Sequence, residues 1–467
     1  MNDDKGAKVR IMMRLMKSLC IPVVCIGCLS AVTIRSVLPV HADSGLPAGE
    51  NAITIFLTGN ALGELKPCGC ASGQLGGLER RPAILEKVPH DKRLVIDTGN
   101  FLADETEQDI IKFGIIIESL TMLGYDIVNL TEGDIRIAED LGLLENLAFD
   151  IISYARDVET KIPVSHTREL QIAGQCLYVT VATINAESDQ IELFEELFSS
   201  RHNGPALNIL IMNNCDEGVV GHIADTDVVD VLVCPSSADE PVIIDKKTRK
   251  PLLISVGQLG KYFGKLTVQV VANQELKLDY SNVPIDENLS ADEGLVQLYK
   301  DYQIMVREEK LLEKAIKVPL PNGLEYVGSN SCGFGNSCHQ YEYEKWSTKG
   351  HAKAYQTLVN VGSQYDPECI RCHVVGLEYE TGFVSEKSHK DLRNVGCEVC
   401  HGPGSKHMMA ILMVEEDTET SEPKSACINC HTPEHSNYEG HEDEYLQKMV
   451  HWEEPKQNTN VKNQGRP

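Results

Sequence analysis

Three copies of one short motif carry the clearest chemistry in this 467-residue sequence. They are Cys369-Ile-Arg-Cys372-His373, Cys397-Glu-Val-Cys400-His401 and Cys427-Ile-Asn-Cys430-His431. Two cysteines at this spacing can bond to the two vinyl groups of a haem, and the adjacent histidine then reaches the iron. Zinc is the alternative, because Cys and His also ligate zinc. A zinc site does not need a histidine directly after the second cysteine each time, so the motifs predict haem c.

A fourth signature is irregular. It reads Cys332-Gly-Phe-Gly-Asn-Ser-Cys338-His339, with five residues between the cysteines. Two glycines would let this spacer bulge, so that both sulfurs could still reach one haem. Attachment through Cys338 alone, or a disulfide between Cys332 and Cys338, are the alternatives. With this signature included, the sequence predicts four haems.

Each motif supplies one axial ligand, so the predicted proximal ligands are His339, His373, His401 and His431. A sixth ligand must come from elsewhere, and six further histidines follow residue 340. They are His351, His389, His407, His435, His441 and His451. Iron held by two histidines carries electrons without an open position, whereas iron that lacks the second histidine could bind a small ligand.

Composition excludes several classes of protein. The chain has 69 acidic and 43 basic residues, and its formal net charge is −26. A nucleic-acid partner is not expected, because phosphate binding needs a basic surface. A polytopic membrane protein is excluded too, since no apolar run after residue 40 approaches about 18 residues. The expected partners are redox proteins with basic docking surfaces, or a larger respiratory complex.

Residues 1–42 have the pattern of a secretory signal peptide. A basic start is followed by the uncharged stretch Ser18–Ile34 and by Val40-His41-Ala42, which resembles a cleavage site. The alternatives are an uncleaved anchor and a lipoprotein modified at Cys28, and only these would attach the chain to a membrane. The signal predicts an exported, periplasmic protein in an oxidising compartment.

Residues 50–288 alternate short β-branched runs with helical patterns. The expected strands are Ile53–Leu57, Leu94–Asp97, Ile127–Leu130, Asp150–Tyr154, Ile209–Met212 and Val228–Val233. The expected helices are Gln108–Gly124 and Ala138–Leu147. Residues 169–184 and 251–285 show strand patterns without helices. This arrangement predicts an α/β domain whose sheet is mixed, or a sandwich of sheets.

The remaining sequence predicts three further segments. Residues 289–320 form a helical connector, in which 291–316 read as one long amphipathic helix. Residues 321–452 hold the Cys-His signatures and form a mainly α domain packed around haems. Residues 453–467 have the composition of a disordered tail.

The motifs YVGSNSC, HAKAY, NVGCEVCHGPGSKH and CINCH together resemble the multihaem cytochrome c-554 family, over about residues 325–452. The resemblance implies a periplasmic tetrahaem electron carrier. By motif position it implies His351, His407 and His451 as distal ligands. The five-residue spacer in the first signature departs from the family pattern.

Residues 53–285 resemble the calcineurin-like metallophosphoesterases of the 5′-nucleotidase type, through VIDTGNFLAD, YDIVNLTEGDI and ISVGQLGKYFGKL. That family hydrolyses phosphate esters with two metal ions. This sequence departs from the expected ligands at almost every position. The departures are Asn60 and Leu62, Asn100, Glu132-Gly133, Asn213 or Asn214, and Cys234-Pro235-Ser236. Amides and leucine are poor ligands for hard divalent metals, so the resemblance predicts a catalytically inactive scaffold with Asp97 in a structural role.

The sequence therefore predicts an exported tetrahaem c-type cytochrome that transfers electrons and carries an inactive phosphoesterase-like domain. Two alternatives stay open. One is a haem oxidoreductase that acts on a small nitrogen compound at an open iron, and the other is a metal-dependent nucleotidase with a cytochrome appendage. Once the predicted signal peptide with its three cysteines is removed, five cysteines remain without a role, and because their number is odd at least one is a thiol or pairs between chains. These are Cys68, Cys70, Cys176, Cys215 and Cys234.

Overall fold

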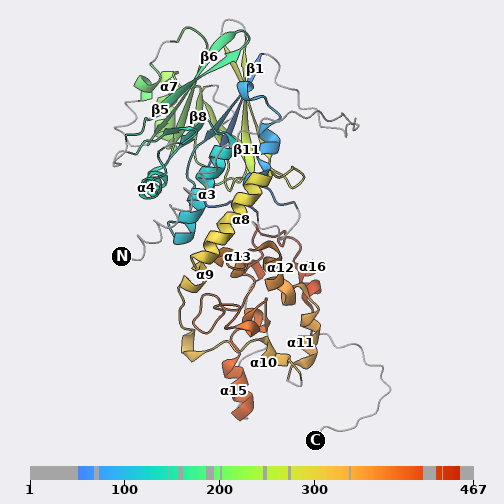
Figure 1. Ribbon diagram of the computed structural model, residues 1–467. Helices are drawn as coiled ribbons and strands as arrows, with labels where there is room; N and C mark the ends of the chain where they lie inside the picture. Colours follow the sequence, from blue (N-terminus) through green and yellow to red (C-terminus); the bar gives the residue numbers. More distant parts are fainter. Residues whose placement is uncertain are drawn as a thin grey trace, which may run out of the picture. The chain divides into compact units, whose positions relative to one another are not determined.

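The computed structural model describes residues 51–67, 73–145, 147–155, 161–185, 194–199, 202–245, 250–271, 275–335, 338–413, 427–433 and 435–452. The predicted signal peptide, Cys28, the Cys68/Cys70 pair and the tail after residue 452 lie outside these ranges. The chain divides into two compact units, 1–67 with 73–302, and 303–467 with 68–72. Figure 1 shows the elements of each unit.

The first unit contains a mixed sheet of six strands in the order β12-β11-β1-β2-β3-β4. The central strands β1, β2, β3 and β4 are parallel, and the β11–β12 hairpin pairs antiparallel to β1. The strands are β1 (Ala52–Thr58), β2 (Arg93–Asp97), β3 (Ile127–Asn129), β4 (Asp150–Ile152), β11 (Tyr262–Val270) and β12 (Leu276–Pro284).

A second mixed sheet has the order β5-β6-β7-β8-β10-β9. Its core strands β6, β7, β8 and β10 are parallel, and antiparallel strands close both edges. The strands are β5 (Ser165–Ile172), β6 (Gln175–Ile184), β7 (Ala206–Met212), β8 (Val231–Val233), β9 (Val242–Asp245) and β10 (Leu252–Ser255).

One apolar core joins the two sheets. Alternate residues of both sheets, such as Ile53 and Ile96 from the first and Val181 and Ile209 from the second, belong to a single buried cluster. Because successive side chains of a strand point to opposite faces, this cluster is the inner layer of a sandwich. The opposite face of the second sheet packs against Ile223 of α7 (Glu217–Thr226). The prediction of an α/β domain with mixed sheets is confirmed.

Of the two helices predicted for the first unit, the one over 108–124 is confirmed as α3, and the described residues contain further helices. The helices of this unit are η1 (Leu78–Arg80), α2 (Pro82–Leu85), η2 (His90–Lys92), α3 (Glu107–Leu123), α4 (Glu132–Asp140), α6 (Phe194–Leu197) and α7. The prediction of a helix over 138–147 is wrong. A capping box between Thr131 and Asp134 starts the helix earlier, and the chain turns at Gly142, whose φ is 63°.

The predicted long connector helix is interrupted. The structure has α8 (Glu293–Glu308) and a short α9 (Leu311–Lys314), and between them Lys310 adopts a left-handed φ of 55°. The division between the two units falls inside α8. A residue with a left-handed φ cannot continue a right-handed α-helix, so the chain changes direction at Lys310 although the apolar periodicity of the sequence is continuous.

The described part of the second unit consists of short helices and loops, with two isolated β-bridges. These helices are η4 (Pro321–Gly323), α10 (Ser329–Gly333), α11 (Gln340–Ser347), η5 (Gly350–Lys353), α12 (Ala354–Val361), α13 (Pro367–Ile370), η6 (Lys390–Leu392), α14 (Cys397–His401), α15 (Ser405–Met413), η7 (Cys427–Asn429) and α16 (Glu442–Met449). A small core that includes Tyr355, Ile370 and Phe383 packs α12 and α13 together with the loop that follows α13. The prediction of a mainly α second domain is confirmed.

No helix within the described ranges is long and apolar enough to cross a lipid bilayer.

A buried polar network lies under the carboxyl ends of β1 and β2. Asp97 accepts hydrogen bonds from Thr58 Oγ1 at 2.6 Å and from the Gly99 amide at 2.8 Å. Thr58 in turn contacts the Tyr125 hydroxyl, which accepts from the guanidinium of Arg81. Asp97 and Arg81 are almost completely buried. Asp97 thus joins an internal network, as its predicted structural role requires.

Burial raises the pKa of Asp97 to about 6, although the hydrogen bonds from Thr58 and Gly99 act to lower this pKa. The folded state therefore binds a proton between pH 4 and 6 that the unfolded state has lost, and the free energy of unfolding falls as the pH rises through this window. Two pKa units correspond to about 3 kcal/mol. We expect Asp97→Asn to remove this dependence, measured by hydrogen exchange of β1 and β2 amides at pH 4 and pH 7.

The exposed Asp91 supplies the control, because Asp91→Asn should leave the wild-type pH dependence in place. Equal pH dependence in the wild type and Asp97→Asn would contradict a raised pKa at Asp97.

Candidate functional site

Each regular Cys-His motif lies in or at a turn of helix. Cys397–His401 forms α14, Cys427 opens η7, and Cys369 lies in α13. Residues three apart on a helical turn lie on the same side, so the two sulfurs of each motif are presented together. All the motif cysteines are thiols in the structure, Cys332 and Cys338 included. The predicted alternative of a Cys332–Cys338 disulfide is therefore wrong.

The irregular signature folds back on itself. Cys332 lies in α10, and Gly335 has a positive φ of 72°. The His339 amide then donates to the Cys332 carbonyl oxygen at 3.1 Å, which closes the loop. The long spacer thus leaves the Cys332 backbone beside Cys338-His339, while residues 336 and 337 lie outside the described ranges.

Three pairs of histidine rings face one another in the second unit. The ring centroids are 6.1 Å apart in His339–His407, 6.0 Å in His351–His431 and 6.3 Å in His401–His451. Every pair joins one predicted proximal ligand to one predicted distal ligand. The remaining proximal residue, His373, has its ring near Ala354 and Thr357 of α12.

These separations fit an iron between two imidazoles. A metal–imidazole bond is about 2 Å long and the ring centroid lies roughly 1 Å beyond the nitrogen, so two rings on one iron have centroids about 6 Å apart. Hydrogen-bonded or stacked rings would normally approach more closely. The residues present therefore fit haem, and the two histidines of each pair would hold its iron.

Two further observations concern the protonation of the rings. The Nδ1 atoms of His373 and His451 lie 2.6 Å and 3.0 Å from the carbonyl oxygens of Ala354 and Met449. A carbonyl only accepts, so Nδ1 must donate and Nε2 is left with its lone pair for a metal. Burial, helped by His431 and His373, lowers the pKa of His351 to about 4, which keeps this ring neutral. Nδ1 of His351 is buried without a hydrogen-bond partner among the described residues.

Thiols of different motifs lie in contact. A hydrogen bond between Cys332 and Cys397 raises the pKa of the first thiol and lowers that of the second to about 7. The thiols of Cys430 and Cys372 are also hydrogen-bonded, and this raises the pKa of Cys430. We number the four signatures in chain order, from the irregular one at 332–339 to the last at 427–431. The first signature therefore adjoins the third (397–401), and the second (369–373) adjoins the fourth.

Glu398, between the two cysteines of the third motif, ties several segments together. Its buried carboxylate accepts from the amides of Val327, Gly328 and Gly404 at 2.7–2.9 Å. Val327 and Gly328 precede α10, and Gly404 precedes α15, which carries His407. One carboxylate thus links the third motif to the segments on both sides of the His339–His407 pair.

A pocket of about 390 Å³ lies in the first unit. It is built at the carboxyl ends of parallel strands, since Asn60 follows β1, Asn100 follows β2, Asn213 follows β7 and Cys234 follows β8. Ligands of α/β proteins commonly bind at this edge. Most positions aligned with the phosphoesterase ligands line this pocket, and they are Asn60, Asn100, Glu132-Gly133, Asn213 and Cys234-Pro235. Leu62, Asn214 and Ser236 do not line it.

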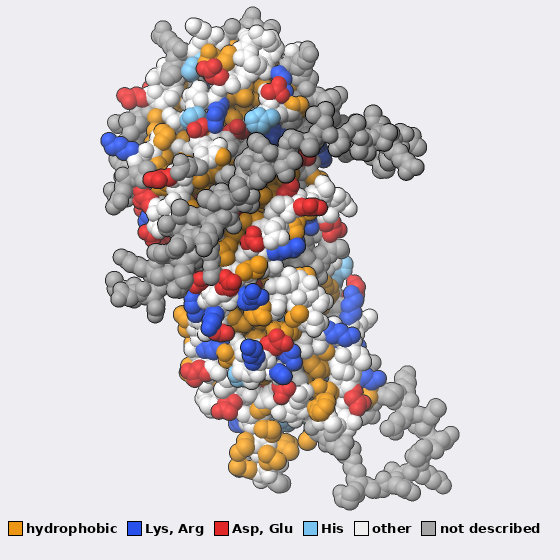
Figure 2. Space-filling view, in the orientation of Figure 1, with side chains coloured by type: hydrophobic (Ala, Val, Ile, Leu, Met, Phe, Trp, Pro, Cys, Tyr) orange, Lys and Arg blue, Asp and Glu red, His pale blue; other side chains and the backbone are white. Residues whose placement is uncertain are grey.

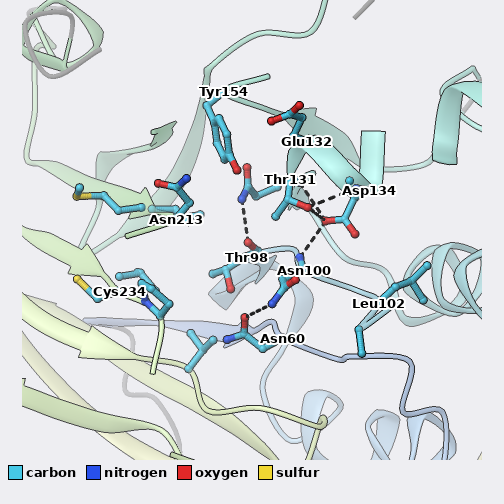
Figure 3. A pocket seen from close by; sticks show the side chains of 18 of the residues that line it. Asn60, Thr98, Asn100, Leu102, Thr131, Glu132, Asp134, Tyr154, Asn213 and Cys234 are labelled. Atoms are coloured by element: carbon cyan, nitrogen blue, oxygen red, sulfur yellow. Dashed lines mark hydrogen bonds between the residues drawn. The ribbon is translucent and has the colours of Figure 1, made fainter. Parts of the chain in front are cut away.

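The interior of the pocket is held by amide hydrogen bonds (Figure 3). Asn100 Nδ2 donates to Asn60 Oδ1 at 3.1 Å, and the side chain of Asn60 donates to the Gly257 carbonyl at 3.0 Å. Asp134 accepts from the backbone amides of Asn100, Phe101 and Thr131, so its oxygens are already occupied. These hydrogen bonds hold the loops after β1 and β2 in place.

The lining does not fit a pair of hydrolytic metal ions. Carboxamides replace carboxylates, and the one buried carboxylate is engaged by backbone amides. Across the described ranges, no group of three or more His, Cys, Asp and Glu side chains is arranged to hold a metal ion. Cys234 lines the pocket and forms a disulfide with Cys215, so its sulfur is not available as a thiolate ligand for a metal. No hydrolytic step is derived for this pocket.

Several of these residues could not be found from the sequence. Tyr154 and Thr98 line the pocket, but neither stands at an expected ligand position. Glu398 occupies a variable position of its motif. The Cys215–Cys234 disulfide accounts for two of the five cysteines left without a role, while Cys176 is a partly exposed thiol of β6.

Comparison with known proteins finds a cytochrome in the second unit. Residues 334–402 match the family described as cytochrome c554 and c-prime. Cytochrome c-554 of Nitrosomonas europaea is 32% identical over 94 residues, which cover 17% of this chain and 39% of that protein. The chain thus spans about two fifths of the length of the relative it matches. The predicted resemblance to cytochrome c-554 is confirmed over this region.

Solved structures similar to this chain include phosphoesterases, in agreement with the second resemblance. The 5′-nucleotidase precursor of Thermus thermophilus has a TM-score of 0.42 and 15% identity, covering 57% of this chain and 61% of its own. The calcineurin-like phosphoesterase YfkN of Bacillus subtilis has a TM-score of 0.41 and 15% identity, covering 55% of this chain and 98% of its own.

The Glu398 contacts lead to a stability prediction. Glu398→Ala leaves three amides without their acceptor, and we expect a loss of about 2–4 kcal/mol in the unfolding free energy of the haem-loaded protein. Glu398→Gln keeps one acceptor oxygen and should lose less. Denaturation followed at the haem absorption band measures both, with Glu380→Gln at an exposed position as the control. Equal stability of Glu398→Ala and the control would contradict the linking role.

The pocket leads to a second prediction. Amides stand at the ligand positions, the buried carboxylate of Asp134 is occupied, and the other lining carboxylates, Asp104, Glu105 and Glu132, are exposed. We therefore expect no Mn²⁺ or Zn²⁺ pair to bind and no metal-stimulated hydrolysis of bis-phosphoesters. Metal analysis after dialysis and a phosphatase assay check this outcome. Metal-dependent turnover that Asn100→Ala abolishes would show that the pocket is an active hydrolytic site.

Proposed function

We propose that this protein is an exported multihaem c-type cytochrome that transfers electrons between redox proteins. The observation that carries the proposal is the set of three facing histidine pairs, each 6.0–6.3 Å between ring centroids and each including the histidine of a Cys-His motif. Such residues would hold haem covalently through the motif cysteines and axially through both rings. When bound, haem c supplies one-electron oxidation and reduction.

The arrangement of the motifs supports transfer along the chain. Cys332 contacts Cys397, and Cys372 contacts Cys430, so the motifs that would hold these groups lie close to one another. The chain's own residues fix the ring orientations through the carbonyls of Ala354 and Met449 and exclude water from His351. Four such groups make up the proposed set. Three lie at the histidine pairs, the one on the irregular signature included, and the fourth is on the motif that contains His373.

The first unit is proposed to be a scaffold without hydrolytic activity, because its pocket lacks the ligands that the reaction needs. Export is proposed from the signal-like residues 1–42, which suit covalent haem attachment outside the cytoplasm. The net charge of −26 favours basic redox partners, whose association would weaken as salt is added.

Mass spectrometry of the mature protein tests the haem assignment. We expect four covalent haem adducts, with one on the peptide that contains Cys338. Cys338→Ala should remove that adduct, whereas Cys332→Ala should leave it attached through a single thioether, with a shifted pyridine haemochrome band.

The matched control is Cys176→Ala, which changes a thiol outside the motifs and should leave four adducts. Two adducts or fewer, or zinc bound in place of haem, would contradict the proposed function.

A further inference from the structure

The pocket of the first unit contains a buried hydrogen-bond acceptor that the protein does not use. Asn129 closes β3, lines the pocket and is only 2% exposed. Its Nδ2 atom donates to the Thr98 carbonyl oxygen at 2.8 Å, while its Oδ1 atom has no partner among the described residues. A buried acceptor without a partner costs free energy, so a ligand that donates a hydrogen bond to this oxygen would recover the loss.

The other asparagines of the pocket also leave acceptors rather than donors. Each uses its side-chain NH₂ group to donate to a protein oxygen, at distances of 2.9–3.1 Å, and they are Asn60, Asn100 and Asn213. The side chains at the former ligand positions thus offer an occupant mainly carbonyl oxygens and carboxylates, which accept hydrogen bonds. A ligand that fits this lining is a hydrogen-bond donor.

The described lining carries negative charge without a base. It contains four carboxylates and no Lys, Arg or His side chain. Glu105 forms an ion pair with Arg136, and backbone amides engage Asp134, whereas Asp104 and Glu132 are exposed and have no ion-pair partner among the described residues. On the face of the molecule that Figure 2 shows, acidic and basic side chains lie interspersed. The one-sided charge of the pocket therefore favours a cation and disfavours a phosphate ester.

The amino end of α4 would ordinarily favour an anion, because helix N-termini present free amides. Here those amides have partners within the protein. Thr131 and Asp134 form a capping box, and the Glu132 amide is hydrogen-bonded to the Tyr154 hydroxyl. The end of this helix thus does not counteract the preference for a cation.

Another part of the lining is apolar. It consists of residues at the ends of β7, β8 and β10 that are at most 4% exposed, and they are Ile211, Met212, Val233 and Val256. Figure 3 shows Cys234, which follows Val233, on the other side of the pocket from Asp134. A ligand with a carbon skeleton would bury apolar surface against this wall, and about 390 Å³ holds a small organic molecule.

We propose that this pocket binds a small organic ammonium ion. Its N–H groups donate to Asn129 Oδ1, the carboxylate of Glu132 compensates its charge, and its carbon skeleton lies against the apolar wall. Binding is non-covalent and needs no metal ion, so it is compatible with a first unit that has no hydrolytic activity. The inference concerns the first unit alone, and it does not depend on the haem assignment.

Isothermal titration calorimetry of the full haem-loaded chain with n-butylammonium tests the proposal. We expect a dissociation constant on the order of 1 mM, as suits so small a ligand, and weaker binding as salt is added. Three related compounds separate the contributions. Methylammonium lacks most of the skeleton and n-butanol lacks the charge, so each should bind at least tenfold more weakly, and n-butyrate should not bind.

Two variants assign the binding to named groups. Glu132→Gln, at an exposed position, should weaken butylammonium binding about fivefold. Asn129→Leu removes the acceptor at similar volume and should weaken it about tenfold. The control is Asp91→Asn, which changes an exposed carboxylate outside the pocket and should bind like the wild type. Thermal unfolding shows whether Asn129→Leu is folded, and if it is not, Glu132→Gln and the ligand series decide.

Several results would overturn the proposal. Butanol that binds as tightly as butylammonium would assign the pocket to a neutral ligand, and binding of butyrate or inorganic phosphate would assign it to an anion. A wild type that binds no butylammonium, or a Glu132→Gln variant that binds it as tightly as the wild type, would show that the lining does not recognise an ammonium ion.

Discussion

The second unit depends on one geometric constraint, the separation of about 6 Å between opposed imidazole rings. A metal between two histidines fixes both nitrogens along one line, and neither ring can move by more than a fraction of an ångström without losing its bond. The three pairs join residues that are far apart in the sequence, so the constraint fixes how the short helices lie relative to one another. The apolar core that includes Tyr355 and Phe383 is small, and the pairs add long-range connections that it lacks.

The local parts of this arrangement were predictable from sequence. The Cys-x-x-Cys-His spacing is complete within five residues, so it needs no knowledge of the fold. Resemblance to cytochrome c-554 gave His351, His407 and His451 as distal ligands, but not the motif that each one faces. The pairing of His351 with the last motif and of His451 with the third arises from tertiary packing. The sequence did not indicate Glu398, because its role depends on hydrogen bonds from three backbone amides, and the types of side chain in a sequence do not show which backbone amides come together.

In the first unit, too, some local elements were predictable from the sequence and others were not. Strand periodicity predicted β1, β2 and β7 because these strands are buried and rich in β-branched residues. Helix α4 was misplaced, since its start is set by the Thr131–Asp134 capping box rather than by apolar periodicity. The carboxyl ends of the parallel strands bring Asn60, Asn100 and Asn213 to one pocket, as the family resemblance implied. Their amides hold the loops by mutual hydrogen bonds, where carboxylates would have required metal ions.

Electron paramagnetic resonance of the oxidised protein tests the paired-histidine account most directly. The ring planes are 31° and 34° apart in the pairs of His339 and His351, but 83° apart in His401–His451. Low-spin ferric iron gives a rhombic signal when its imidazole planes are near parallel and a highly anisotropic signal when they are near perpendicular. We expect both kinds of signal, and we expect His451→Gly to remove the anisotropic one alone and give a high-spin iron. A His451→Gly spectrum that is identical to that of the wild type, or one that loses a rhombic signal instead, would contradict the account.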